Sequence, residues 1–288
     1  MMRGKRHWAL ACRRPDGEIS LHSESLNPIS DRYRFFKWPV VRGVGALWES
    51  LSLGIRALSM SANESLEEED TEIGRKEMAV SLFIGIVMAI GLFVVLPLVA
   101  VGSIRDIFPA TWVFVLAEGI LRIFILILYI VAISRIKQLR RVFEYHGAEH
   151  KTIHALEDGL KLTPENISRF SPVHPRCGTS FLLVVMVIAI VVFSFVGTSP
   201  VWWLIASRLI GIPIIVGLGY EVIKYAGKHM HSRVMMTVML PGLLLQKLTT
   251  REPDLPQIEV AIKALEGVVA LEPVEVELSG KPDVEVMA

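Results

Sequence analysis

The chain has 288 residues, of which 52% are hydrophobic, and its mean hydropathy of +0.49 excludes an ordinary soluble domain and indicates a membrane protein. Its formal net charge of +1 excludes a bulk attraction to nucleic acid, so we expect no nucleic-acid partner. Cys12 and Cys177 are the only two cysteines, and both fall in segments that we expect in the cytosol, which argues against a disulfide framework. The first residues, MMRGKRHW, contain no apolar core and therefore do not predict a signal peptide.

Residues 1–34 predict a cytosolic β-hairpin region. The segments HWALAC and EISLHS flank a turn at Arg14, Pro15, Asp16 and Gly17. Proline and the Asp-Gly pair both favour a tight turn between two strands. We expect a plain hairpin that packs on a larger body.

Residues 35–60 predict an interfacial helix. The segment is apolar and aromatic, but Arg42, Glu49 and Arg56 recur at every seventh position, along one side of a helix. This pattern favours a helix that lies in the membrane interface or docks on membrane spans, because charges within lipid would need partners. Residues 61–77 follow as an acidic, solvated linker.

Four apolar stretches are long enough to cross a membrane, since a span needs roughly 20 apolar residues. They form a first transmembrane pair within residues 78–134 and a second pair within residues 179–226. The last stretch contains Gly211, Pro213 and Gly217, which predict a kink and close helix packing. The four stretches are residues 78–102, 112–134, 179–197 and 201–225.

Lysine and arginine are distributed unevenly between the two ends of these spans. Residues 1–77 hold twelve, residues 135–176 hold eight and the chain after residue 225 holds six, whereas residues 102–111 hold only Arg105. Because positive charge marks the cytoplasmic side, we expect both termini and the central loop in the cytosol. The chain is then a multi-pass protein of the cell (cytoplasmic) membrane.

Ionisable residues also occur within the spans. Glu118 and Arg122 are four residues apart and can pair on one helical face, while Arg208 and Glu221 lie in the last span. Such groups are costly in lipid, so they should face the bundle interior or a wet cavity. They predict either a polar pathway for a substrate or proton, or structural pairing between helices, with Glu221 reaching the interface.

Residues 227–271 predict cytosolic interfacial and amphipathic helices. The segment 234–248 is apolar but short and is broken by Pro241 and Gly242, so we expect it in the interface or packed under the bundle. The segment 254–271 has apolar residues on one helical face. The remaining residues, 272–288, predict a disordered tail.

The central loop, residues 135–178, is rich in histidine and carries the strongest chemical signal. In a helix, His146 and His150 project from one face with Glu149 beside them, and His154 extends the stripe by one turn. The spacing His-x-x-Glu-His matches the inverzincin pattern, in which two histidines hold zinc and the glutamate acts on a bound water.

A second cluster, His174 and Cys177, directly precedes the third span. A metal site then has His146 and His150 as first ligands, and His174, Cys177 or His154, in that order, as the third. The ion would be zinc or another divalent metal, with Glu149 as the general base.

Two other interpretations of these residues stay open. The start of a membrane helix would lower the pKa of Cys177, which could then act as a nucleophile with a nearby histidine as base. Alternatively, the histidines only bind headgroups and Cys177 is a small buried residue. The remaining histidines, His7, His22, His229 and His231, we interpret as surface or structural.

With these motifs, the chain resembles the YqhQ-like family, bacterial membrane proteins of unknown function that are predicted to depend on a metal. The resemblance covers nearly the whole chain and implies a protein of the cytoplasmic membrane with about four spans. The family pattern has a Gly-rich segment before MMRG that is absent here, which places the start codon in question. The motifs are MMRG at 1–4, RRPDG at 13–17, EYHGAEHKTIHALE at 144–157, HPRCGTSF at 174–181 and TTREPDLPQIEVAIKALE at 249–266.

We therefore expect an all-α polytopic membrane protein with about four transmembrane helices, interfacial helices and a small N-terminal β-hairpin. The expected function is metal-dependent hydrolysis of a peptide, lipid or phosphoester bond at the cytosolic membrane face, with catalytic Glu149 or Cys177. Partners would be the lipid bilayer and a membrane lipid or membrane-protein substrate. The alternative is a non-enzymatic transporter, or a scaffold with a structural metal; the sequence specifies neither the substrate nor the oligomeric state.

Overall fold

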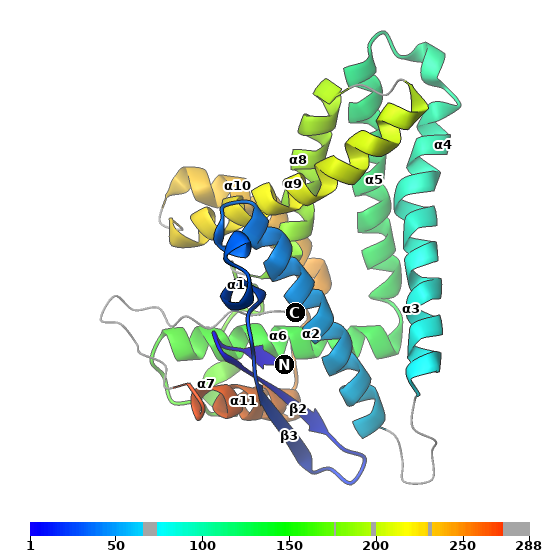
Figure 1. The fold of residues 1–288 in the computed structure, drawn as a ribbon. Coiled ribbons are helices and arrows are strands. Elements are labelled where there is room, and N and C mark those ends of the chain that lie inside the picture. The colour runs from blue at the N-terminus through cyan, green and yellow to red at the C-terminus, as the bar shows by residue number, and fades with distance from the viewer. Residues whose placement is uncertain (66–73, 176, 197–199, 230–231, 273–288) are drawn as a thin grey trace.

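The structure is a computed structural model that describes residues 1–65, 74–175, 177–196, 200–229 and 232–272. Long helices form a bundle, and helix α6 (Lys137–Glu157) crosses beneath one end of it (Figure 1). A small β-sheet and helix α11 (Leu255–Val269) lie on the side of α6 that faces away from the bundle. We call this sheet, together with α6, α7 (Pro164–Ile167) and α11, the end module.

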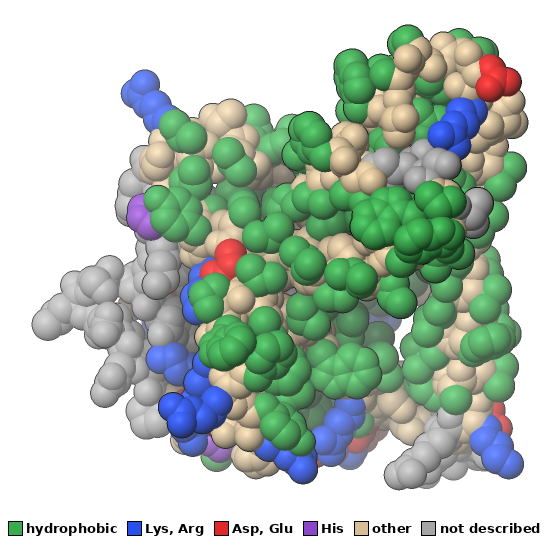
Figure 2. All heavy atoms as spheres, turned by 45° about the horizontal axis from the view of Figure 1, so that its top comes forward, with side chains coloured by type: hydrophobic (Ala, Val, Ile, Leu, Met, Phe, Trp, Pro, Cys, Tyr) green, Lys and Arg blue, Asp and Glu red, His purple; other side chains and the backbone are tan. Residues whose placement is uncertain are grey.

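Within the described residues, four helices are long and apolar enough to cross a membrane, as predicted. Between 6% and 28% of the most apolar stretch of each is buried inside the protein, so mainly apolar side chains face outward (Figure 2). Such a surface suits lipid and explains the high hydropathy of the chain. The helices are α3 (Arg75–Ile90), continued by a π-helical turn (Gly91–Val95) and α4 (Leu96–Gly102), then α5 (Thr111–Ile133), α8 (Gly178–Val196) and α9 (Val201–Lys228). A short 3-10 helix, Arg105–Ile107, connects α4 to α5.

A side chain of α5 supplies a hydrogen bond to the backbone of the first span. Pro97 has no N–H to donate to the carbonyl of Phe93, four residues earlier. Arg122 of α5 donates its Nε to that carbonyl at 2.7 Å, and the same guanidinium pairs with Glu118, as the spacing predicts. Within lipid a freed carbonyl must find a partner in the protein, so this pair has a structural role. Arg208 lies over the ring of Phe193, 3.7 Å from its centroid.

Helix α2 (Val41–Glu64) docks on α9 and on the sheet. It begins after Pro39 and not at residue 35, because a proline holds the preceding residue extended. It also continues through Glu64, into the segment predicted as linker. Two short helices precede it, α1 (Ile29–Arg32) and the 3-10 helix Arg34–Lys37.

The three charges on α2 that recur every seventh residue each find a partner. Arg42 pairs with Glu221 of α9, and an added Cβ on Gly217 would lie 2.2 Å from the carbonyl oxygen of Val40. Glu49 pairs with Arg3 at 2.8 Å. The third charge, Arg56, pairs with Glu24 of the sheet at 2.7 Å. Glycine therefore permits the close packing expected of the last span.

The predicted hairpin belongs to a three-stranded antiparallel sheet in the order β1-β2-β3. Residues Trp8, Leu10 and Cys12 of the central strand face α2, whereas Ala9 and Ala11 face the module core with α11. This strand is therefore covered on both faces, which explains why it is apolar at consecutive positions. The strands are β1 (Met2–Arg3), β2 (His7–Arg13) and β3 (Ile19–Ser25), and β2 pairs with β3 from His7–Ser25 to Arg13–Ile19.

Helix α11 joins the sheet to α6 and contributes half of the buried residues of the module core. A capping box fixes its start, since Asp254 accepts from the backbone N–H of Gln257 and the Gln257 side chain accepts from that of Asp254. Its apolar face buries Ile258 and Leu265 completely, beside Ile153 of α6. The predicted amphipathic helix is thus present, with its apolar face inside the protein.

Helix α10 (Arg233–Thr249) is continuous, although Pro241 and Gly242 predict a break. Gly242 packs so closely on α8 that an added Cβ would lie 2.7 Å from the Cβ of Ser180. Packing against a neighbouring helix offsets the one hydrogen bond that proline removes.

Glu272, the first residue of the predicted tail, has defined contacts with the protein. Glu272 accepts hydrogen bonds from the backbone N–H groups of Lys5 (2.9 Å) and Arg6 (2.5 Å), so it is part of the end module. Residues 273–288 of the predicted tail and residues 66–73 of the predicted linker lie outside the described residues.

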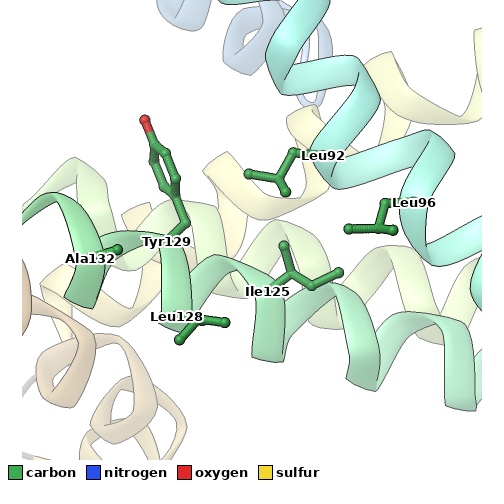
Figure 3. A pocket seen from close by; sticks show the side chains of 6 residues that line it. All are labelled: Leu92, Leu96, Ile125, Leu128, Tyr129 and Ala132. Atoms are coloured by element: carbon green, nitrogen blue, oxygen red, sulfur yellow. The ribbon is translucent and has the colours of Figure 1, made fainter.

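A small apolar pocket lies between the first span and α5 (Figure 3). Leu92 and Leu96 face Ile125 across it, and Leu128 also lines it. Tyr129 and Ala132 complete the lining. This pocket lacks the convergent polar groups that an active site requires, so the candidate site lies elsewhere.

Candidate metal centre

Helix α6 places His146, His150 and His154 on one face, one turn apart, as the sequence predicts. The rings of His146 and His150 are 4.3 Å apart between centroids. Both are buried, and His150 is fully so. Isolated polar side chains are rarely buried in this way, so their partners decide what they can do.

The segment that follows α10 approaches α6 closely at Gly147. A Cβ added there would lie 2.1 Å from the carbonyl oxygen of Arg251. The backbone N–H of Arg251 donates to the carbonyl of Phe143 at 2.9 Å. His146 Nδ1 donates to the carbonyl of Thr249, also at 2.9 Å. With that nitrogen protonated, the Nε2 lone pair of His146 faces the interior.

His150 is oriented in the same way by a different carbonyl. Its Nδ1 donates to the carbonyl of Pro172 at 2.6 Å, and its buried Nε2 has no hydrogen-bond partner among the described residues. Burial, aided by the nearby His146, lowers the pKa of His150 from 6.5 to about 2, so the ring stays neutral. Burial also lowers the pKa of His146. A neutral imidazole with one oriented lone pair is what a metal ligand requires.

Gln246 of α10 fixes the loop that carries the other predicted ligands. Its side chain is fully buried, accepts from the backbone N–H of His174 at 2.9 Å and donates to Ser180 Oγ at 2.8 Å. The loop thereby places Cys177 Sγ 3.3 Å from His146 Nε2. Gln246 has no signature in the sequence, because its role depends on the packing of α10 against α8.

The thiol of Cys177 is fully buried. The start of α8 predicts a lowered pKa, but burial raises the pKa of Cys177, and the contacts with Thr179 oppose that shift only in part. Without a metal, the group is therefore a neutral thiol. A nucleophilic thiolate at this position would need a nearby positive charge.

One set of three predicted ligands comes together here. His146, His150 and Cys177 each offer one ligand atom, and the three atoms lie within 4.8 Å of one another. Two imidazole nitrogens and one thiolate form a donor set that zinc accepts. The ring orientations and the unpartnered Nε2 of His150 also fit such an ion. In the sequence His174 ranks above Cys177 as the third ligand, whereas the structure brings Cys177 to this set.

His154 and His174 lie together in a second set with Glu157, a residue for which the sequence motifs predict no role. The ligand atoms of these three also lie within 4.8 Å of one another. His154 Nε2 donates to the carbonyl of Val173 at 3.0 Å, and His174 Nε2 lies 3.5 Å from Glu157 Oε1. The signal for Glu157 was its spacing of three residues from His154 on the same face of α6.

Glu149, the predicted general base, lies beside the first set. Its carboxylate contacts the amino group of Met1. Burial has the larger effect on the pKa of both neighbouring groups, lowering that of His146 and raising that of Cys177. The negative charge of Glu149 raises both pKa values. It therefore opposes the effect of burial at His146 and adds to it at Cys177. A carboxylate in this position can accept a proton close to His146 and Cys177.

The other histidines lie apart from both sets. His7 contacts Glu272, His22 contacts Glu64, and His229 stacks on Tyr225. His231 is outside the described residues.

Comparisons with known proteins agree on one family. Residues 38–271 match the family described as Protein of unknown function (DUF1385). The chain is also 32% identical, over 291 residues, to the "Uncharacterized protein YqhQ" of Bacillus subtilis (strain 168), which covers 94% of this chain and 90% of that protein. No solved structure matches the chain.

Proposed function

The chain belongs to the family of proteins of unknown function DUF1385, and we propose that it is a metal-dependent hydrolase of the membrane, with an ion held by His146, His150 and Cys177. The observation that carries the proposal is the convergence of these three ligand atoms. Backbone carbonyls of Thr249 and Pro172 turn both imidazole lone pairs inward. An ordinary core histidine would satisfy its second nitrogen within the protein.

The donor set favours zinc, with another divalent metal as the alternative. Catalytic zinc commonly has three protein ligands and one open position. The ion would supply Lewis acidity to the bond that is cleaved. Glu149 would accept a proton from the attacking water, and the carbonyls of Thr249 and Pro172 would hold the two rings in place.

The location of the site supports a substrate at the membrane surface. Helix α6 follows the second span directly, and Cys177 precedes the third span by one residue. A peptide, lipid or phosphoester bond near the headgroups would be within reach of such a site. By the distribution of lysine and arginine we place it on the cytosolic face of the cell membrane.

A scaffold with a structural metal is the alternative, and one observation favours it. His150 and Cys177 are fully buried, and a structural ion needs no opening to solvent. A transport pathway has less support, because Glu118 and Arg122 pair with each other and Arg122 also donates to the carbonyl of Phe93.

The metal is tested directly on protein purified in detergent. We expect about one or more zinc ions per chain by mass spectrometry, and a loss of metal in H150A, because this variant removes an oriented ligand. H229A, which changes a histidine outside both sets, should keep the wild-type content. Full metal content in H150A would contradict the ligand assignment.

Catalysis is tested with E149Q, which keeps the size of the side chain but cannot accept a proton. We expect unchanged metal content and a fall of roughly 10²- to 10⁴-fold in the hydrolysis of fluorogenic ester, phosphodiester or peptide probes. Unchanged turnover in E149Q would exclude Glu149 as the base. Metal without turnover of any probe by the wild type would favour the scaffold.

A further inference from the structure

Beside the first metal position lies a second group of potential ligands. His154 and Glu157 come from the last turn of α6, and His174 comes from the loop before α8. Their ligand atoms lie within 4.8 Å of one another, and His174 Nε2 is 3.5 Å from Glu157 Oε1. His174 is fully buried, and the Glu157 side chain is 15% exposed.

From this geometry we infer that His154, Glu157 and His174 bind a second divalent metal ion, so that the chain carries a two-metal centre. The inference rests on the proposed function, because it places this ion next to the one held by His146, His150 and Cys177. Two imidazoles and one carboxylate are a donor set that zinc, manganese and iron accept.

The orientation of His154 supports this assignment. Its Nε2 donates to the carbonyl of Val173 at 3.0 Å, which leaves the Nδ1 lone pair for a ligand. The ring also stacks on Phe170, with 6.0 Å between the ring centroids and an angle of 7° between the planes. Its position is therefore set from two sides, as expected for the support of a metal ligand.

One loop orients histidines of both sets. Consecutive carbonyls, those of Pro172 and Val173, accept from His150 and His154 respectively. The rings of His150 and His174 are 5.8 Å apart, and those of His154 and His174 are 4.5 Å apart. The two ligand groups are thus neighbours along α6.

A simple ion pair between His174 and Glu157 is the competing explanation. It accounts for two of the three groups but not for the convergence of His154, whose ring centroid lies 4.5 Å from that of His174. One cation satisfies all three donors at once, and the carboxylate offsets part of its charge. A simple ion pair predicts no metal at this position. The two explanations therefore differ in the number of metal ions bound per chain.

The test is a cobalt titration of the full-length, metal-free protein in detergent. Bound metal is counted by mass spectrometry, and the thiolate-to-cobalt charge-transfer band reports the position that includes Cys177. We expect two equivalents in the wild type, with the band. E157Q, a near-isosteric change, and H154A should bind one equivalent and keep the band. E165Q, a change on the neighbouring helix α7, should bind two.

The outcomes separate this inference from the proposed function. One equivalent with the band in the wild type would overturn the second position and leave the first intact. Loss of the band in H154A or E157Q would also overturn it, because these residues would then support the first ion. No band in the wild type would overturn the proposed function itself.

Discussion

Gly147 is a residue of the candidate centre at which an added side chain would meet backbone. An added Cβ would lie 2.1 Å from the carbonyl oxygen of Arg251, and backbone cannot move aside as a side chain end can. The same segment provides the Thr249 carbonyl that orients His146. A single methyl group at this position should therefore disturb both stability and metal binding.

For G147A we expect a loss of about 1–3 kcal/mol in the free energy of unfolding, as is typical of overpacking, together with reduced metal content. G54A is the matched control, because Gly54 lies in helix α2 with nothing within 4 Å of an added Cβ. Thermal unfolding and metal analysis of both variants provide the measurement. Equal stability of G147A and wild type would show that the segment after α10 moves freely.

The sequence predicts part of this centre at the level of single residues. The spacing of His146, Glu149 and His150 requires only a helix, so their common location could be inferred. The position of Cys177, rather than His174, beside His146 and His150 could not be inferred from the sequence. It depends on how Gln246 and two backbone carbonyls hold the loop. Glu157 had the right spacing from His154 but matched no known motif.

At the contact between the first two spans, a charged pair on α5 satisfies a backbone carbonyl of the neighbouring helix. Arg122 satisfies the carbonyl that Pro97 frees at Phe93 and pairs with Glu118, whose side chain is 7% exposed. For R122M we expect a loss of about 3–5 kcal/mol, because a buried charge and a carbonyl lose their partner. Chemical unfolding in detergent gives the measurement.

Two further variants define the origin of that loss. The double variant E118Q/R122M should recover part of the stability, because it removes the uncompensated charge. R135M is the control, since Arg135 is exposed. If R122M is as stable as R135M, the pair has no structural role, and the pathway interpretation regains support.

The docking of the sheet on α2 should depend on pH. Glu64, the last residue of α2, accepts hydrogen bonds from Arg14 and His22. The hydrogen bond from Arg14 is the main reason that the pKa of Glu64 falls from 4.5 to about 2. A carboxylate with a depressed pKa stabilises the fold above its unfolded pKa, and this contribution is lost as the pH falls from 4.5 towards 2.

We therefore expect the E64Q variant to be less stable than wild type at pH 7 by roughly 1 kcal/mol, since the partner Arg14 is 44% exposed and solvent weakens the pair. The difference should disappear near pH 2. Thermal unfolding from pH 7 to about pH 2 measures the trend. E24Q is the control, and an equal acid sensitivity of E64Q and wild type would remove Glu64 as the cause.

At the level of elements, the spans could be predicted from hydropathy alone, because their length and apolar content follow from the thickness of the bilayer. The strand β1 could not, since it has two residues and exists only through pairing with β2. The sequence also does not predict that α10 continues through Pro241. Local propensity argues for a break, and only packing against α8 explains the helix.

At the scale of the whole molecule, the distribution of lysine and arginine predicts the orientation in the membrane. We expect a membrane-impermeant maleimide to label D106C in intact cells and K263C only after permeabilisation. Asp106 lies between the first two spans, and Lys263 lies on α11 in the end module. The two native cysteines are buried, which keeps the background low. The reverse labelling pattern would place the candidate centre on the outer face.

The sheet and helix α11 come from opposite ends of the chain yet share one core. On a ribosome the strands emerge first and the helix that covers them emerges last, after all four spans have left the exit tunnel. Until α11 emerges, the face of the sheet that contains Ala9 and Ala11 therefore lacks the helix that covers it. A premature stop before Leu255 should leave inserted spans with an unfinished module, a natural target for membrane quality-control proteases.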